Sequence, residues 1–303
     1  MLWAVHISDG VLAAPWWLSG YGVAAALIAL GVWRIRDDEV PRIALLTAAF
    51  FVISLIHVPL GFTSVHLLMN GLVGILLGPR AALAIACGLF LQYWLIGHGG
   101  LQTLGINTCI IALPALFAWL LMRACQQMPW RRHPGFRALL VMTGAATWIL
   151  SLVFSVVLLG EQGLHWTTGL QASAVETAWA RTIHPLTLTL TLALSALAAW
   201  GERRLENAPE FPLGLLLGEL AVLATVALNC IVLLAGMVEE MPPLMPLILL
   251  VGHLPIAVIE GIILGFTLGF LAKVKPELLG ELPTQRHPEE STIAWQDTPA
   301  HRS

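Results

Sequence analysis

Long apolar runs separated by short polar connections recur along almost the whole chain. The hydrocarbon core of a bilayer is about 30 Å thick, and about 20 apolar residues in a helix cross it. Shorter passes are tolerated where helices break inside a bundle. We therefore expect an all-α polytopic transmembrane helix bundle with about seven to nine passes. The apolar runs lie at residues 18–33, 43–58, 66–79, 81–96, 106–122, 138–159, 184–200, 213–236 and 245–272.

The third and fourth runs are short, and Gly78, Pro79 and Arg80 separate them. This turn fits either the cytoplasmic rim of the bundle or a break within an irregular pair of half-helices. After Pro276 the chain becomes polar and too poor in apolar residues to bury a core. We therefore divide the chain into a transmembrane domain at residues 1–275 and a polar, disordered cytoplasmic tail at residues 276–303.

The composition fits a chain whose main solvent is lipid. Hydrophobic residues make up 58% of it and charged residues 11%, whereas a soluble domain carries roughly 25% charged residues. A net charge of -3 gives no indication of a nucleic-acid partner. The four cysteines show no CxxC spacing, which favours small buried hydrophobes over disulfides or a zinc site. They are Cys87, Cys109, Cys125 and Cys230.

The basic residues predict the orientation of the bundle, because cytoplasmic loops retain Lys and Arg. With nine passes and the N-terminus outside, only Arg181 of the 15 Lys and Arg residues falls on the outer side. We therefore expect the C-terminus to lie inside. The same topology places seven histidines at or near the outer face: His6, His57, His66, His98, His165, His184 and His253.

Two polar stretches near the outer face carry candidate ligands. The leader contains HISDG, from His6 to Gly10, which taken alone also fits an exposed histidine in a polar segment. The stretch from Gly61 to Gly71 contains TSVHLLMN. We expect it to open a helix capped by Ser64 or Thr63, with His66 and Asn70 on one face. Polar groups inside a membrane segment indicate function by default, although interhelical hydrogen bonding also explains Asn70.

Two further stretches follow in the later part of the chain. GHGGLQTLGINT, from Gly97 to Thr108, has four glycines that allow a close backbone approach to a ligand; a tight extracellular turn is the alternative. In the last pass, His253 and Glu260 are seven residues apart and face the same way. A buried carboxylate needs a partner, and a neighbouring helix or a metal ion would serve.

These stretches, in this order and spacing, resemble the CbiM/NikM family, the substrate-binding membrane subunits of energy-coupling-factor cobalt/nickel transporters. The resemblance rests on HISDG, TSVHLLMNGLVGILLGPRAAL, GHGGLQTLGINT and HLPIAVIEGIILGF. It is weaker at about 125–245, where the chain is longer than typical members and has room for an additional pair of passes.

The resemblance implies a metal site at the extreme N-terminus. Its donors are the terminal amine, the amide and imidazole of a histidine in second position, and the histidine of the central TSxH stretch. By motif, His6 and His66 are the corresponding ligands. Nitrogen donors suit Ni(II) or Co(II), whereas magnesium prefers oxygen. The resemblance further implies neighbouring groups that orient the site, and these are Asp9, Ser64, Asn70, His98 and Asn107.

One departure from the family pattern concerns the start of the chain. The histidine is sixth, and Met1-Leu2-Trp3-Ala4 precede Val5, so the terminal amine is not where the pattern needs it. Translation from a GTG codon at position 5 would restore the pattern, and intact-mass measurement tests this hypothesis. If the extension is retained, His57 and His98 are the candidates that complete a site with His6 and His66, with a preference that extends to Zn(II).

The function implied by the resemblance is capture of Co(II) or Ni(II) for an ATP-driven importer in the inner membrane, with cobalamin biosynthesis as one use of cobalt. Such a subunit is not an enzyme and binds no cofactor beyond the transported ion. Its partners would be a transmembrane coupling subunit, ATP-binding subunits and a small accessory membrane subunit. No GxxxxGK[ST] run occurs, so another chain must hydrolyse ATP.

Two other classes of function stay open at this point. An intramembrane zinc-dependent hydrolase could use the histidines with Glu219 and Glu260, although neither HExxH nor GxSxG occurs. An ion-coupled secondary permease would favour an inverted repeat, and none is evident. The sequence does not choose between cobalt and nickel.

Overall fold

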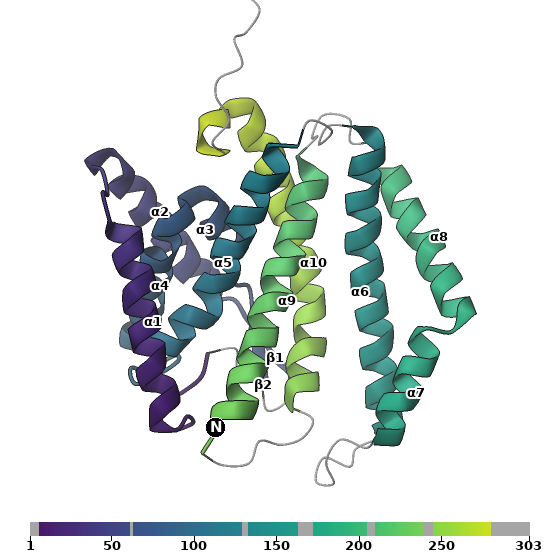
Figure 1. The fold of residues 1–303 in the computed structure, drawn as a ribbon, viewed down its shortest axis with the longest axis horizontal. Helices are drawn as coiled ribbons and strands as arrows, with labels where there is room; N and C mark the ends of the chain where they lie inside the picture. Colours follow the sequence, from purple (N-terminus) through teal and green to yellow (C-terminus); the bar gives the residue numbers. More distant parts are fainter. Residues whose placement is uncertain are drawn as a thin grey trace, which may run out of the picture.

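The computed structural model describes residues 6–60, 63–128, 133–162, 172–204, 210–238 and 245–279 (Figure 1). The helices in these ranges are α1 (Ala14–Val32), α2 (Val40–Ser54), α3 (Asn70–Leu77), α4 (Ala81–Ile96), α5 (Leu104–Gln126), α6 (Pro134–Gln162), α7 (Ala172–Thr182), α8 (Pro185–Glu202), α9 (Phe211–Gly236) and α10 (Met245–Val274). Short 3₁₀ turns lie at η1 (Asp37–Glu39), η2 (Gly78–Arg80) and η3 (Pro276–Leu279). The antiparallel hairpin consists of β1 (His57–Leu60) and β2 (Thr63–His66).

The expected transmembrane helix bundle is confirmed. Within the described residues, six helical stretches are long and apolar enough to cross a bilayer, by length and composition. The pair α7 and α8, bent by 52° at a short break, would make a seventh. The structure therefore reaches the lower end of the seven to nine passes expected from the apolar runs. At 15 residues, α2 is shorter than the other apolar helices counted.

The third apolar run is only half a pass, because α3 begins deep in the bundle and ends at a turn. Contacts of Asn70 with Ile111, Gly74 with Ala115 and Gly78 with Trp119 advance by four residues on both α3 and α5. Regular advance in the same direction means that α3 runs parallel to α5. Since α4 returns to the start of α5, α3 and α4 run in opposite directions (Figure 1), and η2 is a turn at the end of the bundle.

The helix ends that carry most basic residues gather at one end of the bundle, the upper end in Figure 1. The ends of α1, α5, α8 and α10 and the starts of α2 and α6 lie there. The leader and the connection between α4 and α5 lie at the opposite end. A concentration of basic residues at one end of the bundle is expected, because loops on one side of the membrane retain Lys and Arg. Which end faces the cytoplasm stays a prediction.

Helices α9 and α10 pack closely against each other through glycines. A Cβ atom placed on Gly214 would lie 2.6 Å from Cα of Gly265, and one placed on Gly218 would lie 2.7 Å from Cα of Gly261. Small residues allow helix backbones to approach closely in membranes. The two glycine pairs are four residues apart on each helix, which fixes the antiparallel register of α9 and α10.

The start of the expected polar tail is packed against the bundle. In η3, Leu279 is buried, and its carbonyl oxygen accepts a hydrogen bond from Nε2 of Gln126 at 2.8 Å. Residues 280–303 lie outside the described ranges, so disorder of the tail stays a prediction.

Candidate metal centre

The leader enters the bundle and is fixed there by side chains of α5 and the preceding loop. Asn107 binds both backbone groups of Ile7: Oδ1 accepts from its N–H at 2.9 Å, and Nδ2 donates to its carbonyl at 2.8 Å. The hydroxyl of Thr103 donates to the same carbonyl at 2.6 Å. The neighbouring His6 is thereby held in a fixed position, 3% exposed.

The glycine-rich loop at residues 97–103, here called the closing loop, packs against the leader, the segment from His6 to Ala13 that precedes α1. The carboxylate of Asp9 accepts hydrogen bonds from the N–H groups of Leu101 at 3.0 Å and Thr103 at 3.2 Å. A Cβ atom at Gly100 would overlap a carboxylate oxygen of Asp9. The loop is therefore more than a tight turn, because its missing side chain lets its backbone grip the leader.

His66 is presented by a strand, and the expected helix start at Ser64 or Thr63 is wrong. Thr63–His66 pair with His57–Leu60, and α3 begins only at Asn70. The intervening Met69 has φ of +49°, an uncommon conformation for a residue with a side chain. Such an irregular segment can lie inside a bundle only if other groups satisfy its backbone.

Glu260 of α10 supplies those acceptors. Its carboxylate accepts hydrogen bonds from the backbone N–H groups of Leu68 and Met69, the latter at 2.9 Å. Carboxylate acceptors make stronger hydrogen bonds with N–H groups than neutral acceptors do. The partner of this buried carboxylate is thus the loop after His66. The sequence alone indicates a neighbouring helix or a metal ion as that partner.

Three imidazoles meet at the end of the leader. The ring centroids of His6 and His66 are 4.7 Å apart, those of His6 and His98 are 4.7 Å apart, and those of His66 and His98 are 5.8 Å apart. One candidate ligand nitrogen from each ring lies within 4.8 Å of the others. His6 and His66 are buried, and His98 is half-buried. The structure thereby brings His6 together with His66, and adds His98 to them.

The tautomer of His66 can be inferred from its hydrogen bond. Its Nδ1 lies 3.0 Å from the carbonyl oxygen of Leu67. A carbonyl oxygen only accepts, so Nδ1 carries the proton and the lone pair is on Nε2. A backbone carbonyl on the second ring nitrogen is the usual way in which proteins orient a metal-binding imidazole.

The other residues expected at the site have different positions. His57 lies opposite His66 in the hairpin, and Ser64 lies opposite Pro59; the side chains of residues 57–60, 63 and 64 lie outside the described part. Asn70 is buried, and its side chain donates hydrogen bonds to the carbonyl oxygen of Ile111 and the hydroxyl of Thr225. Asn107 binds the leader backbone, and Asp9 binds the backbone of the closing loop, as described above.

His253 and Glu219 lie apart from this centre. His253 is buried, and its Nδ1 donates to the carbonyl oxygen of Leu249 at 2.6 Å. A Cβ atom at Gly144 of α6 would lie 2.9 Å from Oε2 of Glu219, so this carboxylate faces α6. Among the described residues, the group able to hold a metal consists of His6, His66 and His98. A zinc hydrolase with Glu219 or Glu260 as general base therefore has no support in this geometry.

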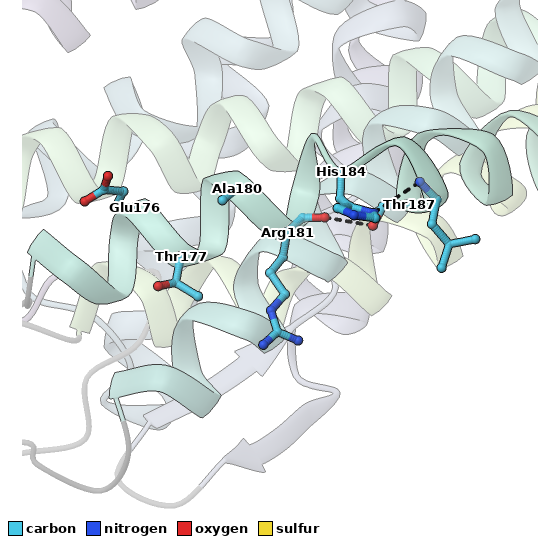
Figure 2. A pocket seen from close by; sticks show the side chains of 7 residues that line it. Glu176, Thr177, Ala180, Arg181, His184 and Thr187 are labelled. Atoms are coloured by element: carbon cyan, nitrogen blue, oxygen red, sulfur yellow. Dashed lines mark hydrogen bonds between the residues drawn. The ribbon is translucent and has the colours of Figure 1, made fainter.

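A cavity of about 730 Å³ at the bend between α7 and α8 is a second concave site (Figure 2). His184 lies at the bend, and its Nδ1 accepts a hydrogen bond from the N–H of Leu186 at 3.2 Å. The hydroxyl of Thr187 donates to the carbonyl oxygen of Arg181 at 2.7 Å. Arg181 lines the same cavity, and its positive charge opposes a metal cation. These polar groups cap and stabilise the bend.

Comparison with known proteins identifies the family. The family model CbiM, described as the cobalt uptake substrate-specific transmembrane region, matches residues 6–192 and 185–278. The chain belongs to the CbiM family. The match includes all three histidines of the centre, and the protein is accordingly a multi-pass membrane protein. The two matched segments overlap inside α8.

Individual proteins are similar to this chain over shorter stretches. A protein of Haemophilus influenzae, named as a metal transport protein, is 43% identical over 120 residues, or 40% of this chain and 58% of its own length. The cobalt transport protein CbiM of Geobacter sulfurreducens is 33% identical over 135 residues, or 41% of this chain and 39% of its own. A fused nickel transport protein NikMN of Archaeoglobus fulgidus is 33% identical over 118 residues, or 37% of this chain and 39% of its own. The chain therefore spans about two to three fifths of these relatives.

Proposed function

We propose that this protein is the ion-capturing membrane component of an importer for Co(II) or Ni(II). The observation that carries the proposal is the meeting of His6, His66 and His98, with candidate ligand nitrogens within 4.8 Å of one another. Imidazole nitrogen suits divalent cobalt, nickel and zinc far better than it suits magnesium or calcium. Membership of the CbiM family and the names of its relatives favour cobalt and nickel.

The leader acts as one wall of the capture site in this proposal. His6 comes from the leader, His66 from the hairpin and His98 from the closing loop, so a bound ion would join three separate segments of the chain. Binding energy is therefore used to hold the leader in place. Release of the ion requires these segments to separate, and a partner that moves the leader or the loop would achieve this.

The source of energy in this proposal is outside the chain, which has no phosphate-binding loop motif. We therefore propose that the protein lies in the inner membrane with partners of three kinds: a transmembrane coupling subunit, ATP-binding subunits and a small accessory membrane subunit. The fused composition named for the Archaeoglobus relative supports a membrane partner. The protein itself catalyses no reaction and needs no cofactor beyond its cargo, and cobalamin biosynthesis is one destination for cobalt.

The experiment compares metal retention by the purified protein and two variants. The wild-type protein should retain about one equivalent of Co(II) or Ni(II) after desalting, whereas His6→Ala/His66→Ala should retain none. His133→Ala is the matched control, because His133 is an exposed imidazole at the start of α6, at the other end of the bundle. Stoichiometric retention by the double variant, or equal loss in the control, would contradict the proposal.

A further inference from the structure

Three asparagines are buried in the described part of the chain, Asn70, Asn107 and Asn229, and only two of them have hydrogen-bond partners there. Asn107 uses both amide atoms on Ile7. Asn70 donates to the carbonyl of Ile111 and the hydroxyl of Thr225, and accepts from Gly71. Asn229 of α9 is 0% exposed, and neither its Oδ1 nor its Nδ2 has a partner.

The two unpaired amide atoms of Asn229 lower the stability of the folded protein unless something binds them. A buried polar group without a hydrogen bond costs about 1–3 kcal/mol, and a carboxamide has two such atoms. A leucine of similar size would avoid that cost. A native protein that keeps an unpaired buried group does so for a function or for an ion or water that the group binds. The surroundings of Asn229 indicate which of these applies.

The position of Asn229 follows from the hydrogen bonds that Asn70 makes with two different helices. Asn70 binds α5 at Ile111 and α9 at Thr225. Helix α5 begins, and α9 ends, at the same end of the bundle (Figure 1). One turn towards that end, about 6 Å, leads from Ile111 to Asn107 and from Thr225 to Asn229. Asn107 and Asn229 therefore lie at one level.

This level is that of the histidines. Asn107 holds Ile7, the residue next to His6, and Ile7 belongs to the same buried cluster as Val226 and Val232, which flank Asn229 on α9. The unpartnered carboxamide thus lies on the α9 side of the leader, at the depth where His6 meets His66 and His98.

We propose that the carboxamide oxygen of Asn229 is an additional ligand of the captured ion. Three imidazole nitrogens and one oxygen give four donors, a number that Co(II), Ni(II) and Zn(II) accept. A neutral oxygen completes the site without an additional negative charge in the bundle. It also connects the ion to α9, which is packed along its length on α10, the helix that holds the loop after His66 through Glu260. This inference rests on the proposed function and specifies its ligand set.

The test uses Asn229→Leu in the purified full-length protein, titrated with Co(II) alone. Leucine has the branching of asparagine and the same number of side-chain heavy atoms, and it removes the unpaired polar atoms, so the metal-free variant should still fold and unfold cooperatively on heating. The Co(II) dissociation constant should nevertheless rise at least about tenfold, as for loss of one metal-site contact. The visible absorption of the residual Co(II) complex should shift, because one ligand has changed.

A matched control separates ligand loss from a general effect on α9. Leu233→Ala cuts a buried side chain one turn further along the same helix. It should lower the unfolding temperature and leave the Co(II) dissociation constant within about twofold of wild type, because it creates a cavity without touching a ligand.

Two results would overturn the inference. One is an Asn229→Leu protein with the wild-type dissociation constant. The other is a weaker complex with the wild-type Co(II) spectrum, because a ligand cannot be lost without a change in the ligand field. If wild-type protein binds no Co(II), or binds it equally well without His66, the proposed function fails and this inference falls with it. If wild-type binding depends on His66 but not on Asn229, only the inference fails.

Discussion

At the scale of single residues, His6 and His66 are positioned by groups that lie outside the proposed ligand set. Glu260 holds the N–H groups of Leu68 and Met69, two and three residues after His66. Asn107 holds Ile7, directly after His6. These two proposed ligands are thus positioned through the backbone of residues one to three positions further along the chain. Outer groups of this kind typically change metal affinity by about 10–100-fold when they are lost.

Glu260→Gln tests this positioning. A glutamine offers one acceptor oxygen and an NH₂ group that cannot accept from an N–H, so one of the two backbone donors loses its partner. We expect the Co(II) dissociation constant to rise about tenfold, measured by titration in detergent, with unchanged membrane insertion. Wild-type affinity in this variant would show that the loop keeps its position without the carboxylate.

How much of the site could be predicted differed from residue to residue. His6 and His66 were indicated by motifs and by family resemblance, whereas the role of Glu260 was not, because its partners lie 191 and 192 residues away in the sequence. Asn229 lies in an apolar run without any motif. Its position in the bundle follows only from the contacts of neighbouring residues in the folded structure, and a sequence pattern does not contain those contacts.

At the scale of elements, the closing loop and the hairpin are the parts that shape the site. Apolar runs predicted the helices, because lipid requires hydrophobic surfaces and internally paired backbones. The same reasoning misread residues 63–66 as a helix start. Their strand pairs with His57–Leu60, and its extended continuation is stabilised by a distant carboxylate, so local propensity could not reveal it.

Gly100→Ala tests the closing loop. The added Cβ atom would overlap the Asp9 carboxylate, which must then leave the N–H groups of Leu101 and Thr103. We expect the variant to fold and insert but to lose most of its metal retention, because His6 is displaced. Gly22→Ala is the control, since a Cβ atom there meets nothing within 4 Å. Full metal retention by Gly100→Ala would argue against a gripping role for the loop.

The ion pair between Glu39 of η1 and Arg80 of η2 joins two turns at one end of the bundle. The N–H of Arg36 and the guanidinium of Arg80 bind Glu39 and hold the pKa of its carboxyl below the usual range, against an opposing effect of burial. A lowered pKa in the folded state means that stabilisation is present at neutral pH and is lost as the pH falls through that pKa.

Glu39→Gln should therefore lower the stability of the folded state by up to about 1 kcal/mol at neutral pH, the range for partly exposed ion pairs. Thermal unfolding in detergent measures the difference. At a pH well below the usual carboxyl pKa the two proteins should unfold at the same temperature. A difference that persists in acid would mean that the ionised carboxylate is not what stabilises the turn.

At the scale of the whole molecule, one end of the bundle carries the basic helix ends, and the other carries the leader and the connection between α4 and α5 (Figure 1), which contribute His6 and His98 to the proposed metal centre. The sequence predicted this separation from the placement of Lys and Arg. The half-length α3 and the bent pair of α7 and α8 explain why the number of passes was harder to predict, since a broken helix has the same composition as a complete pass.

Labelling of single cysteines in a cysteine-free background tests the sidedness. Leu101→Cys lies in the closing loop, is 45% exposed in wild type, and should react with a membrane-impermeant maleimide added to the periplasmic face. Arg203→Cys lies at the opposite end, after α8, and should react only when the inner face is opened. Reversed labelling would place the capture site on the cytoplasmic side and exclude capture from outside.

The central claim is that His6, His66 and His98 bind one ion together. X-ray absorption spectroscopy of the Co(II)- or Ni(II)-loaded protein tests it most directly, because imidazole rings bound to a metal give a distinctive scattering pattern. We predict scattering from three imidazoles in the wild-type protein and from two in His98→Ala. A spectrum without imidazole scattering, or one that His98→Ala and His66→Ala leave unchanged, would contradict the account.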